Sequence, residues 1–344
     1  MNKTYTEIMD QYEALAFTAD YIDARLPEIA TLFQGCDQYV FIGCGSSYAV
    51  AESGALIARL RMEKPATAIA AGDLLLHADT YRPVLKNSLL VVLSRSGETS
   101  EAIRAVDLVR TMGLDCKVLG VACVEESTLA MRSDAILEMP WAFDHSVCQT
   151  RTVSCLYLFC AYSIAKLVGD ETLVMDLRTA IAGGPEFISS IEAALKAVAK
   201  GDWTHTVVLG DAELGGLCEE GALAFKEICQ LPSNHHHLLD VRHGPMVLIG
   251  KRTLVIAVLS EPNNRLELDV LHDIAAKGAT VVAYSDEPLD APGIINVCFG
   301  QKLRHSARGI PAIAVCQLIS YHKSFQTGAD PDRPDGLSPW IALS

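Results

Sequence analysis

Two segments rich in glycine and hydroxyl groups have the residue types that bind a phosphate. Residues 43–48 read GCGSSY, and residues 94–99 read SRSGET. Serine and threonine donate hydrogen bonds without carrying charge, and glycine lets backbone N–H groups approach an anion closely. A helix that starts after each loop adds free N–H groups and the positive end of its dipole. The alternative is that these hydroxyls only cap helices. The expected phosphate contacts are Cys44, Gly45, Ser46, Ser47, Ser94, Arg95, Ser96 and Thr99.

A second group of residues can move protons. Residues 219–228 (EEGALAFKEI) are predicted to form a helix on which Glu220 and Glu227 share a face, with Leu223 between them. A carboxylate beside apolar side chains holds its proton more tightly, which suits a general base near neutral pH. His243 precedes Gly244 and Pro245 in a tight turn, and an imidazole can exchange protons near neutral pH. Taken alone, each carboxylate is more often a solvated helix residue, and an isolated histidine such as His243 is more often structural.

Metal and dinucleotide sites are not expected. Residues 234–237 (NHHH) form a histidine run, but consecutive side chains point in different directions and rarely share one ion. No carboxylate or cysteine stands at ligand spacing from the run. In GCGSSY, Tyr48 occupies the place of the third glycine in a dinucleotide-binding loop. The sequence therefore predicts a site without metal or other cofactor.

The elements that position these residues form a repeated α/β pattern. Apolar strands are predicted at 38–43, 88–93, 117–121, 206–210, 253–259 and 280–284, with the clearest helices at 50–60 and 98–112. Alternating apolar strands and helices indicate parallel sheets covered on both faces, a three-layer αβα fold of flavodoxin-like or Rossmann-like type. The separation from Gly43 to Ser94 nearly equals that from Gly210 to Ser260, which indicates an internal duplication. The loop 210–213 (GDAE) lacks hydroxyls, so only the first half has the phosphate-binding pattern.

The expected domain boundaries follow from this repeat. Residues 1–34 are assigned to a helical segment, 35–180 to the first domain, 195–330 to the second domain and 331–344 to a tail. Helices are predicted at 156–168 and 187–199, with a break at residues 183–185 (GGP).

Composition limits the kinds of partner. The net charge is −14 and the basic residues are scattered, which disfavours a nucleic-acid binder. Most of the 11 cysteines lie in apolar runs, as expected of reduced core thiols. The polar start has no apolar signal region, and the apolar stretches fall short of an uninterrupted membrane span of about 18 residues. These features predict a cytoplasmic protein without membrane contact.

The paired loops CGSSY and SRSGETSEAI resemble the signature of the sugar isomerase (SIS) domain family. Both halves are similar in order to the isomerase part of the glutamine–fructose-6-phosphate aminotransferases and to the ketosamine-6-phosphate deglycases and deaminases. The resemblance implies that the first loops bind a sugar phosphate. It also implies that Glu227 carries a proton between C1 and C2 of the open-chain sugar. By the same resemblance, His243 opens the sugar ring from a neighbouring subunit, so the protein would be at least a homodimer.

The resemblance also suggests sugar contacts. Residues 144–152 (DHSVCQTRT) resemble the stretch that closes over the sugar, which makes Val147 and Gln149 candidate contacts, with Glu220 as a further one. A helix cap at Thr150 or Thr152 is the alternative for this stretch.

Several positions depart from the aminotransferase pattern. Ala224 and Pro339 stand where that pattern has lysines, Arg95 stands where it more often has glutamine, and Asn2 replaces the nucleophilic cysteine of a glutaminase domain. The preferred function is therefore a ketosamine-6-phosphate deglycase or deaminase rather than a glutamine-dependent transferase. An aldose–ketose isomerase and a non-catalytic sugar-phosphate sensor are the alternatives. The sensor is disfavoured because residues 1–37 are too few for a DNA-binding module with a linker.

Overall fold

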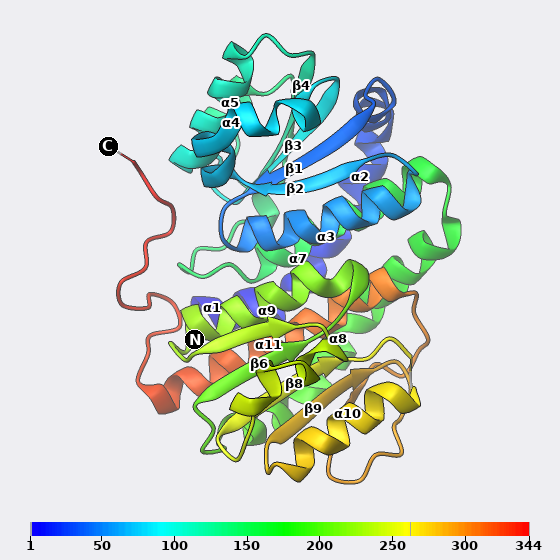
Figure 1. Cartoon of the computed structure of the whole chain (residues 1–344), viewed down its shortest axis with the longest axis vertical. Helices are drawn as coiled ribbons and strands as arrows, with labels where there is room; N and C mark the ends of the chain where they lie inside the picture. The colour runs from blue at the N-terminus through cyan, green and yellow to red at the C-terminus, as the bar shows by residue number, and fades with distance from the viewer. Residues whose placement is uncertain (1, 262, 344) are drawn as a thin grey trace. The chain divides into compact units, whose positions relative to one another are not determined.

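The computed structural model describes residues 2–261 and 263–343, which divide into two compact units (Figure 1). The N-terminal unit contains residues Asp10–Arg178 and the C-terminal segment that starts at Ser338. The C-terminal unit contains the residues up to Met9 and Thr179–Leu337. Each unit is therefore built from two separate stretches of sequence.

A five-stranded parallel sheet forms the centre of the N-terminal unit. The strand order is β2-β1-β3-β4-β5, and every residue of β3 is buried. Helices α2, α3 and α7 pack on one face of the sheet, and α4, α5 and α6 lie on the other (Figure 1). The strands are β1 (Gln38–Gly43), β2 (Ala66–Ala70), β3 (Ser88–Ser94), β4 (Cys116–Ala122) and β5 (Ala135–Glu138), and the helices are α2 (Gln11–Gln34), α3 (Ser46–Arg61), α4 (Ala71–Leu85), α5 (Ser100–Thr111), α6 (Thr128–Arg132) and α7 (Arg151–Val168).

The C-terminal unit repeats this plan. Its parallel sheet has the order β10-β9-β8-β6-β7. Read from β7, this is the strand order of the other sheet, so the structure contains the predicted duplication. The strands are β6 (His205–Leu209), β7 (Ser233–His236), β8 (Thr253–Val258), β9 (Thr280–Ser285) and β10 (Ile295–Cys298), and the helices are α1 (Lys3–Met9), α9 (Gly215–Ile228), α10 (Arg265–Ala276) and α11 (His305–Thr327). The expected α/β class with two parallel, helix-covered sheets is confirmed.

One predicted break is wrong. The residues expected to interrupt the chain, 183–185, lie inside a single helix, α8 (Glu171–Ala199), which contains Pro185. Packing accounts for the glycine at 183, because a Cβ added there would lie 3.0 Å from Cζ of Phe299. Gly183 thus gives the Phe299 ring room to contact the helix directly.

Helix α7 bears on the expectation that the chain makes no membrane contact. By length and composition it is the single helix among the described residues that could cross a membrane, with a mean hydropathy of 1.2. However, 78% of it is buried inside the protein. Helix α7 also packs against α2 and α3. A helix that is apolar on nearly every side is what the core of a large α/β unit requires.

Candidate active site

The loop after β1 brings two buried serines to the start of α3. A side chain at Gly43 would place its Cβ 2.5 Å from the backbone carbonyl carbon of Ser47, so only glycine lets the helix begin this close to the strand. Gly45 has a φ of 53°, in the left-handed region that favours glycine. Helix α3 then starts at Ser46, and the side chains of Ser46 and Ser47 are buried. The positive end of the helix dipole therefore faces this loop.

The loop after β3 holds its serines through backbone N–H groups. The Ser94 hydroxyl oxygen accepts a hydrogen bond from the N–H of Gly97 at 2.9 Å, and the Ser96 hydroxyl accepts from the N–H of Glu98 at 3.1 Å. Each hydroxyl acts as an acceptor in these bonds, so its O–H stays available to donate to a ligand. The Glu98 carboxylate accepts from the N–H and the hydroxyl of Thr128, both at 2.7 Å, which fixes the end of the loop.

Both loops line one small pocket in the N-terminal unit. Its walls are Cys44, Ser47, Leu93, Ser94, Arg95, Ser96, Thr99, Ala102, Gln149 and Pro339. Seven of the residues expected at the site therefore meet here. Gly45, Ser46 and Val147 are not among the lining residues, although each adjoins one or lies in the same loop. Pro339, from the C-terminal segment, was not expected in this pocket.

Cys44 contributes a neutral thiol to the pocket. Burial, reinforced by the nearby Glu101 carboxylate, raises the pKa of Cys44 to about 12. A thiol with this pKa stays protonated at neutral pH and is a poor nucleophile. The residue can donate a weak hydrogen bond, but the structure gives it no activating partner among the described residues.

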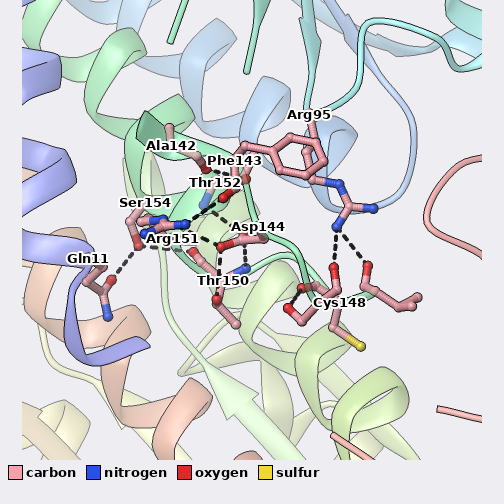
Figure 2. A network of polar contacts seen from close by, with 12 residues as sticks. Gln11, Arg95, Ala142, Phe143, Asp144, Cys148, Thr150, Arg151, Thr152 and Ser154 are labelled. Atoms are coloured by element: carbon pink, nitrogen blue, oxygen red, sulfur yellow. Dashed lines mark hydrogen bonds and ion pairs between the residues drawn. The ribbon is translucent and has the colours of Figure 1, made fainter. Parts of the chain in front are cut away.

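A buried carboxylate organises residues 142–152 (Figure 2). One oxygen of Asp144 accepts hydrogen bonds from the N–H groups of Thr150 at 2.7 Å and Thr152 at 2.9 Å. The Thr152 hydroxyl donates to the carbonyl of Ala142 at 2.6 Å. The capping expected of Thr150 or Thr152 is thus performed by Asp144, which closes the start of α7 instead. Gln149 directly precedes Thr150 in this stretch. Its side-chain oxygen is buried without a hydrogen-bond partner, and the residue lines the pocket.

Arg95 is a buried cation held by backbone carbonyls (Figure 2). The residue is 3% exposed. Its Nη1 donates to the carbonyl oxygens of Ser146 at 3.0 Å and Val147 at 2.9 Å, and its Nη2 donates to that of Pro339. The guanidinium carbon lies 5.9 Å from the centre of the Phe143 ring. Among the described residues, no carboxylate lies within ion-pair distance of Arg95.

The candidate base lies on α9 in the C-terminal unit. Glu220 is buried, whereas Glu227 and Leu223 between them are half-buried, so one face of the helix passes from the interior toward solvent. Ala224 is also buried. The Glu220 carboxylate lies close enough to Cys316 on α11 to contribute to the raised pKa of that thiol, after the larger effect of burial. Glu227 therefore has the partial exposure that a group exchanging protons with a ligand needs.

His243 lies in an exposed turn of the same unit. Its N–H donates to the carbonyl of Asp240 at 2.8 Å, and Gly244 has a φ of 130°. The short helix Pro245–Leu248 follows, with none of its residues buried. Val247 is 81% exposed and Leu248 71% exposed. An imidazole beside exposed apolar side chains is placed for contact with another surface.

The histidine run lies on the edge strand β7 and its end. His235 Nε2 contacts the carbonyl of Gly210 at 3.0 Å, and His237 Nδ1 contacts the Asp211 carboxylate at 2.9 Å. Burial lowers the pKa values of His235 and His236, which favours neutral rings. In residues 2–261 and 263–343, no group of three or more His, Cys, Asp or Glu side chains is arranged to hold a metal ion.

A larger hollow in the C-terminal unit is a weaker candidate. It has a volume of about 610 Å³ and is lined by aromatic and charged residues, among them Tyr5, Glu192, Lys196 and His322. Its polar groups partly satisfy one another, since Tyr5 donates to Glu192 at 2.9 Å and His322 Nε2 lies 3.4 Å from the same carboxylate oxygen. It also lacks a glycine- and hydroxyl-rich loop. The smaller pocket therefore has the better anion-binding chemistry.

The N-terminal unit contains a region that matches a known protein family. Residues 32–163, which include both loops of the pocket, match the model of the SIS domain family. Over 341 residues the chain is 29% identical to the glutamine–fructose-6-phosphate aminotransferase of Yersinia pseudotuberculosis, covering 92% of this chain and 53% of that protein. The chain thus spans about half the length of the curated relatives it matches.

Two solved structures share the fold over nearly the whole chain. Glucosamine-6-phosphate deaminase from Thermotoga maritima aligns with a TM-score of 0.81 and 24% identity, covering 99% of this chain and all of that one. Tagatose-6-phosphate ketose/aldose isomerase from Escherichia coli aligns with a TM-score of 0.87 and 22% identity, covering 99% and 96%. At these identities, the likeness shows the two-sheet α/β fold.

Proposed function

We propose, from the SIS domain to which residues 32–163 belong, that the protein is a phosphosugar isomerase-type enzyme. More specifically, we propose a deglycase or deaminase of ketosamine 6-phosphates. The observation that carries the proposal is the pocket in which two hydroxyl-rich loops converge at helix N-termini. Such loops at the carboxyl ends of parallel strands are the usual ligand sites of open α/β sheets.

The phosphate of the substrate is assigned to this pocket. Its ligands are the hydroxyls and backbone N–H groups of the two loops, supplied by Cys44, Gly45, Ser46, Ser47, Ser94, Ser96 and Thr99, with the positive charge of Arg95 beside them. The O–H groups of Ser94 and Ser96 remain available as donors. Val147 and Gln149 are proposed next to the sugar, and the buried Gln149 oxygen without a partner supports this. Glu220 is the remaining proposed sugar contact.

Glu227 and His243 are proposed as the acid–base pair. His243 assists ring opening, and the Glu227 carboxylate removes a proton from C1 of the open-chain ketosamine, next to the C2 carbonyl. Return of the proton to C2 leaves an imine between C1 and the amine nitrogen. Water adds to this imine, the C1–N bond breaks, and the amine and an aldose phosphate are released. The overall reaction consumes one water and involves no oxidation.

Because the chain departs from the transferase pattern, we expect water, and not a lysine amine of the enzyme, to react at the sugar carbon. Ala224 is buried within α9, and Pro339 lines the pocket, where the pattern has lysines. Neither residue can form a covalent imine with the sugar. The second candidate is an aldose–ketose isomerase, since Glu227 alone suffices to move a proton between C1 and C2, and no amine-recognising group is identified among the described residues.

A homodimer or larger assembly is proposed from the surface around His243. Exposed Val247 and Leu248 adjoin this histidine and form an apolar segment that a second copy would cover. The 11 free thiols, most of them buried, agree with a reducing cytoplasmic location.

The test is an assay of the purified protein against a panel of ketosamine 6-phosphates and simple ketose 6-phosphates. Glu227→Gln is expected to lower amine release at least 100-fold. Glu219→Gln, an exposed carboxylate on the same helix, is the matched control and should keep wild-type activity. Interconversion of aldose and ketose phosphates without amine release would favour the isomerase. Binding without turnover, unaffected by Glu227→Gln, would leave a sensor.

A further inference from the structure

Arg95 places a positive charge beside the proposed phosphate pocket, but commits three of its N–H groups to backbone carbonyls of the protein. Nη1 donates to two carbonyls (Figure 2). Nη2 donates to a third, so both terminal nitrogens have protein partners. The Phe143 ring lies 5.9 Å away and the side chain is 3% exposed. Three of the five guanidinium N–H groups therefore bond to the protein, while Nε is buried without a hydrogen-bond partner.

The three carbonyls belong to two segments that are far apart in the sequence. Ser146 and Val147 lie in the stretch organised by Asp144, just before Gln149. Pro339 lies 244 positions from Arg95 and belongs to the C-terminal segment. Both Gln149 and Pro339 line the pocket. Arg95 therefore joins two segments that both contribute to the pocket wall to the loop that supplies Ser94 and Ser96.

The C-terminal segment has further bonds along the start of α5. The Ser100 N–H donates to the carbonyl of Ile341 at 3.1 Å, and the Leu343 N–H donates to the Ser100 hydroxyl at 3.0 Å. Arg104 Nη2 donates to the carbonyl of Leu343 at 3.0 Å. These contacts hold residues 341–343, whereas Arg95 holds the residue that reaches the pocket. Among the hydrogen bonds of the described residues, the one from Arg95 is the bond that reaches Pro339.

We propose that Arg95 is a positioning residue, which fixes Gln149 and Pro339 around the phosphate pocket and sets sugar-phosphate affinity through them. This inference rests on the phosphate pocket of the proposed function. A planar guanidinium can bond to three carbonyls in fixed directions, whereas a lysine ammonium supplies the same charge without that geometry. The two roles of Arg95, as a charge near the phosphate or as a clamp on backbone, therefore predict opposite results for lysine.

The test compares Arg95→Lys and Arg95→Gln with the wild type in two measurements. Hydrogen exchange of the ligand-free protein is expected to be faster in residues 145–149 and 338–341 of both variants, whereas the Leu343 N–H, which Ser100 holds, should exchange as in the wild type. Calorimetry with fructose 6-phosphate is expected to give a Kd at least 10-fold higher for both, corresponding to about 1.4 kcal/mol or more. Arg104→Gln, which removes one exposed bond to the same segment, is the control and should change Kd less than 2-fold.

A Lys variant with wild-type affinity and wild-type exchange would overturn the inference and leave Arg95 as a charge. A wild-type protein that binds neither fructose 6-phosphate nor inorganic phosphate would instead overturn the proposed function, while the ligand-free exchange data still decide whether Arg95 holds the two segments.

A shortened chain that ends at Leu337 tests the same inference with Arg95 intact. It should bind fructose 6-phosphate more weakly than the full chain. Adding Arg95→Gln to it should cost less affinity than the same change in the full chain, because one of the three carbonyl partners is already gone. Additive losses would contradict coupling through Pro339.

Discussion

Thr99 is a residue at which phosphate binding can be separated from stability. Its side chain lines the pocket, and it precedes α5 without forming a side-chain cap bond. Thr99→Val keeps the shape and removes only the hydroxyl, so Kd for fructose 6-phosphate should rise roughly 10-fold, the cost of one hydrogen bond to a charged group. Thr111→Val, at the far end of α5, is the control. Equal affinities of the two variants would exclude the Thr99 hydroxyl as a ligand.

For single residues, the sequence predicts those site contacts whose partners lie close together in the chain. Ser94 ends a strand and Ser96 and Thr99 follow within five residues, so their shared pocket follows from the pattern of residues. The partners of Arg95 do not, because its carbonyl contact at Pro339 is set by how a distant segment returns to the loop. Backbone carbonyls also carry no residue-specific signal that a sequence could reveal.

Among the elements, the start of α7 depends on Asp144. This carboxylate is 1% exposed and accepts from two N–H groups, which would otherwise be buried without partners. Asp144→Ala is expected to lower the free energy of unfolding by about 2–3 kcal/mol, measured by urea denaturation. Asp79→Ala, which removes an exposed carboxylate paired with Arg82 at 3.7 Å, should change it by less than about 0.5 kcal/mol. Equal stabilities would mean that water satisfies those N–H groups.

The strands show where the sequence pattern stops being informative. The three central strands of each sheet were predicted, because they are buried on both faces and read as apolar runs. The missed strands are β2, β5, β7 and β10, which are the edges of the two sheets. Each has only four or five residues and an incomplete burial pattern. Such segments form strands because a neighbouring strand pairs with them, not because of their own composition.

For the whole molecule, self-association is the property to measure. Val247→Asp is expected to shift the protein toward monomer in sedimentation or light scattering, because it places a charge on the exposed segment next to His243. Leu76→Asp is the control, since Leu76 is 77% exposed, close to the 81% of Val247, but lies on α4 of the other unit. If Val247→Asp has the same mass as the wild type, the segment is not the interface.

The division of each unit into two separate stretches of sequence determines when that unit can finish folding during synthesis. The N-terminal unit needs Pro339 for its pocket wall. In the C-terminal unit, the N–H groups of Lys3 and Thr4 bond to the Asp332 carboxylate at 3.0 and 2.9 Å. During synthesis from the N-terminus, neither unit can therefore reach its final form until residues beyond 330 have left the ribosome. A cut at Arg178 would likewise yield no intact half, since each fragment lacks a piece carried by the other.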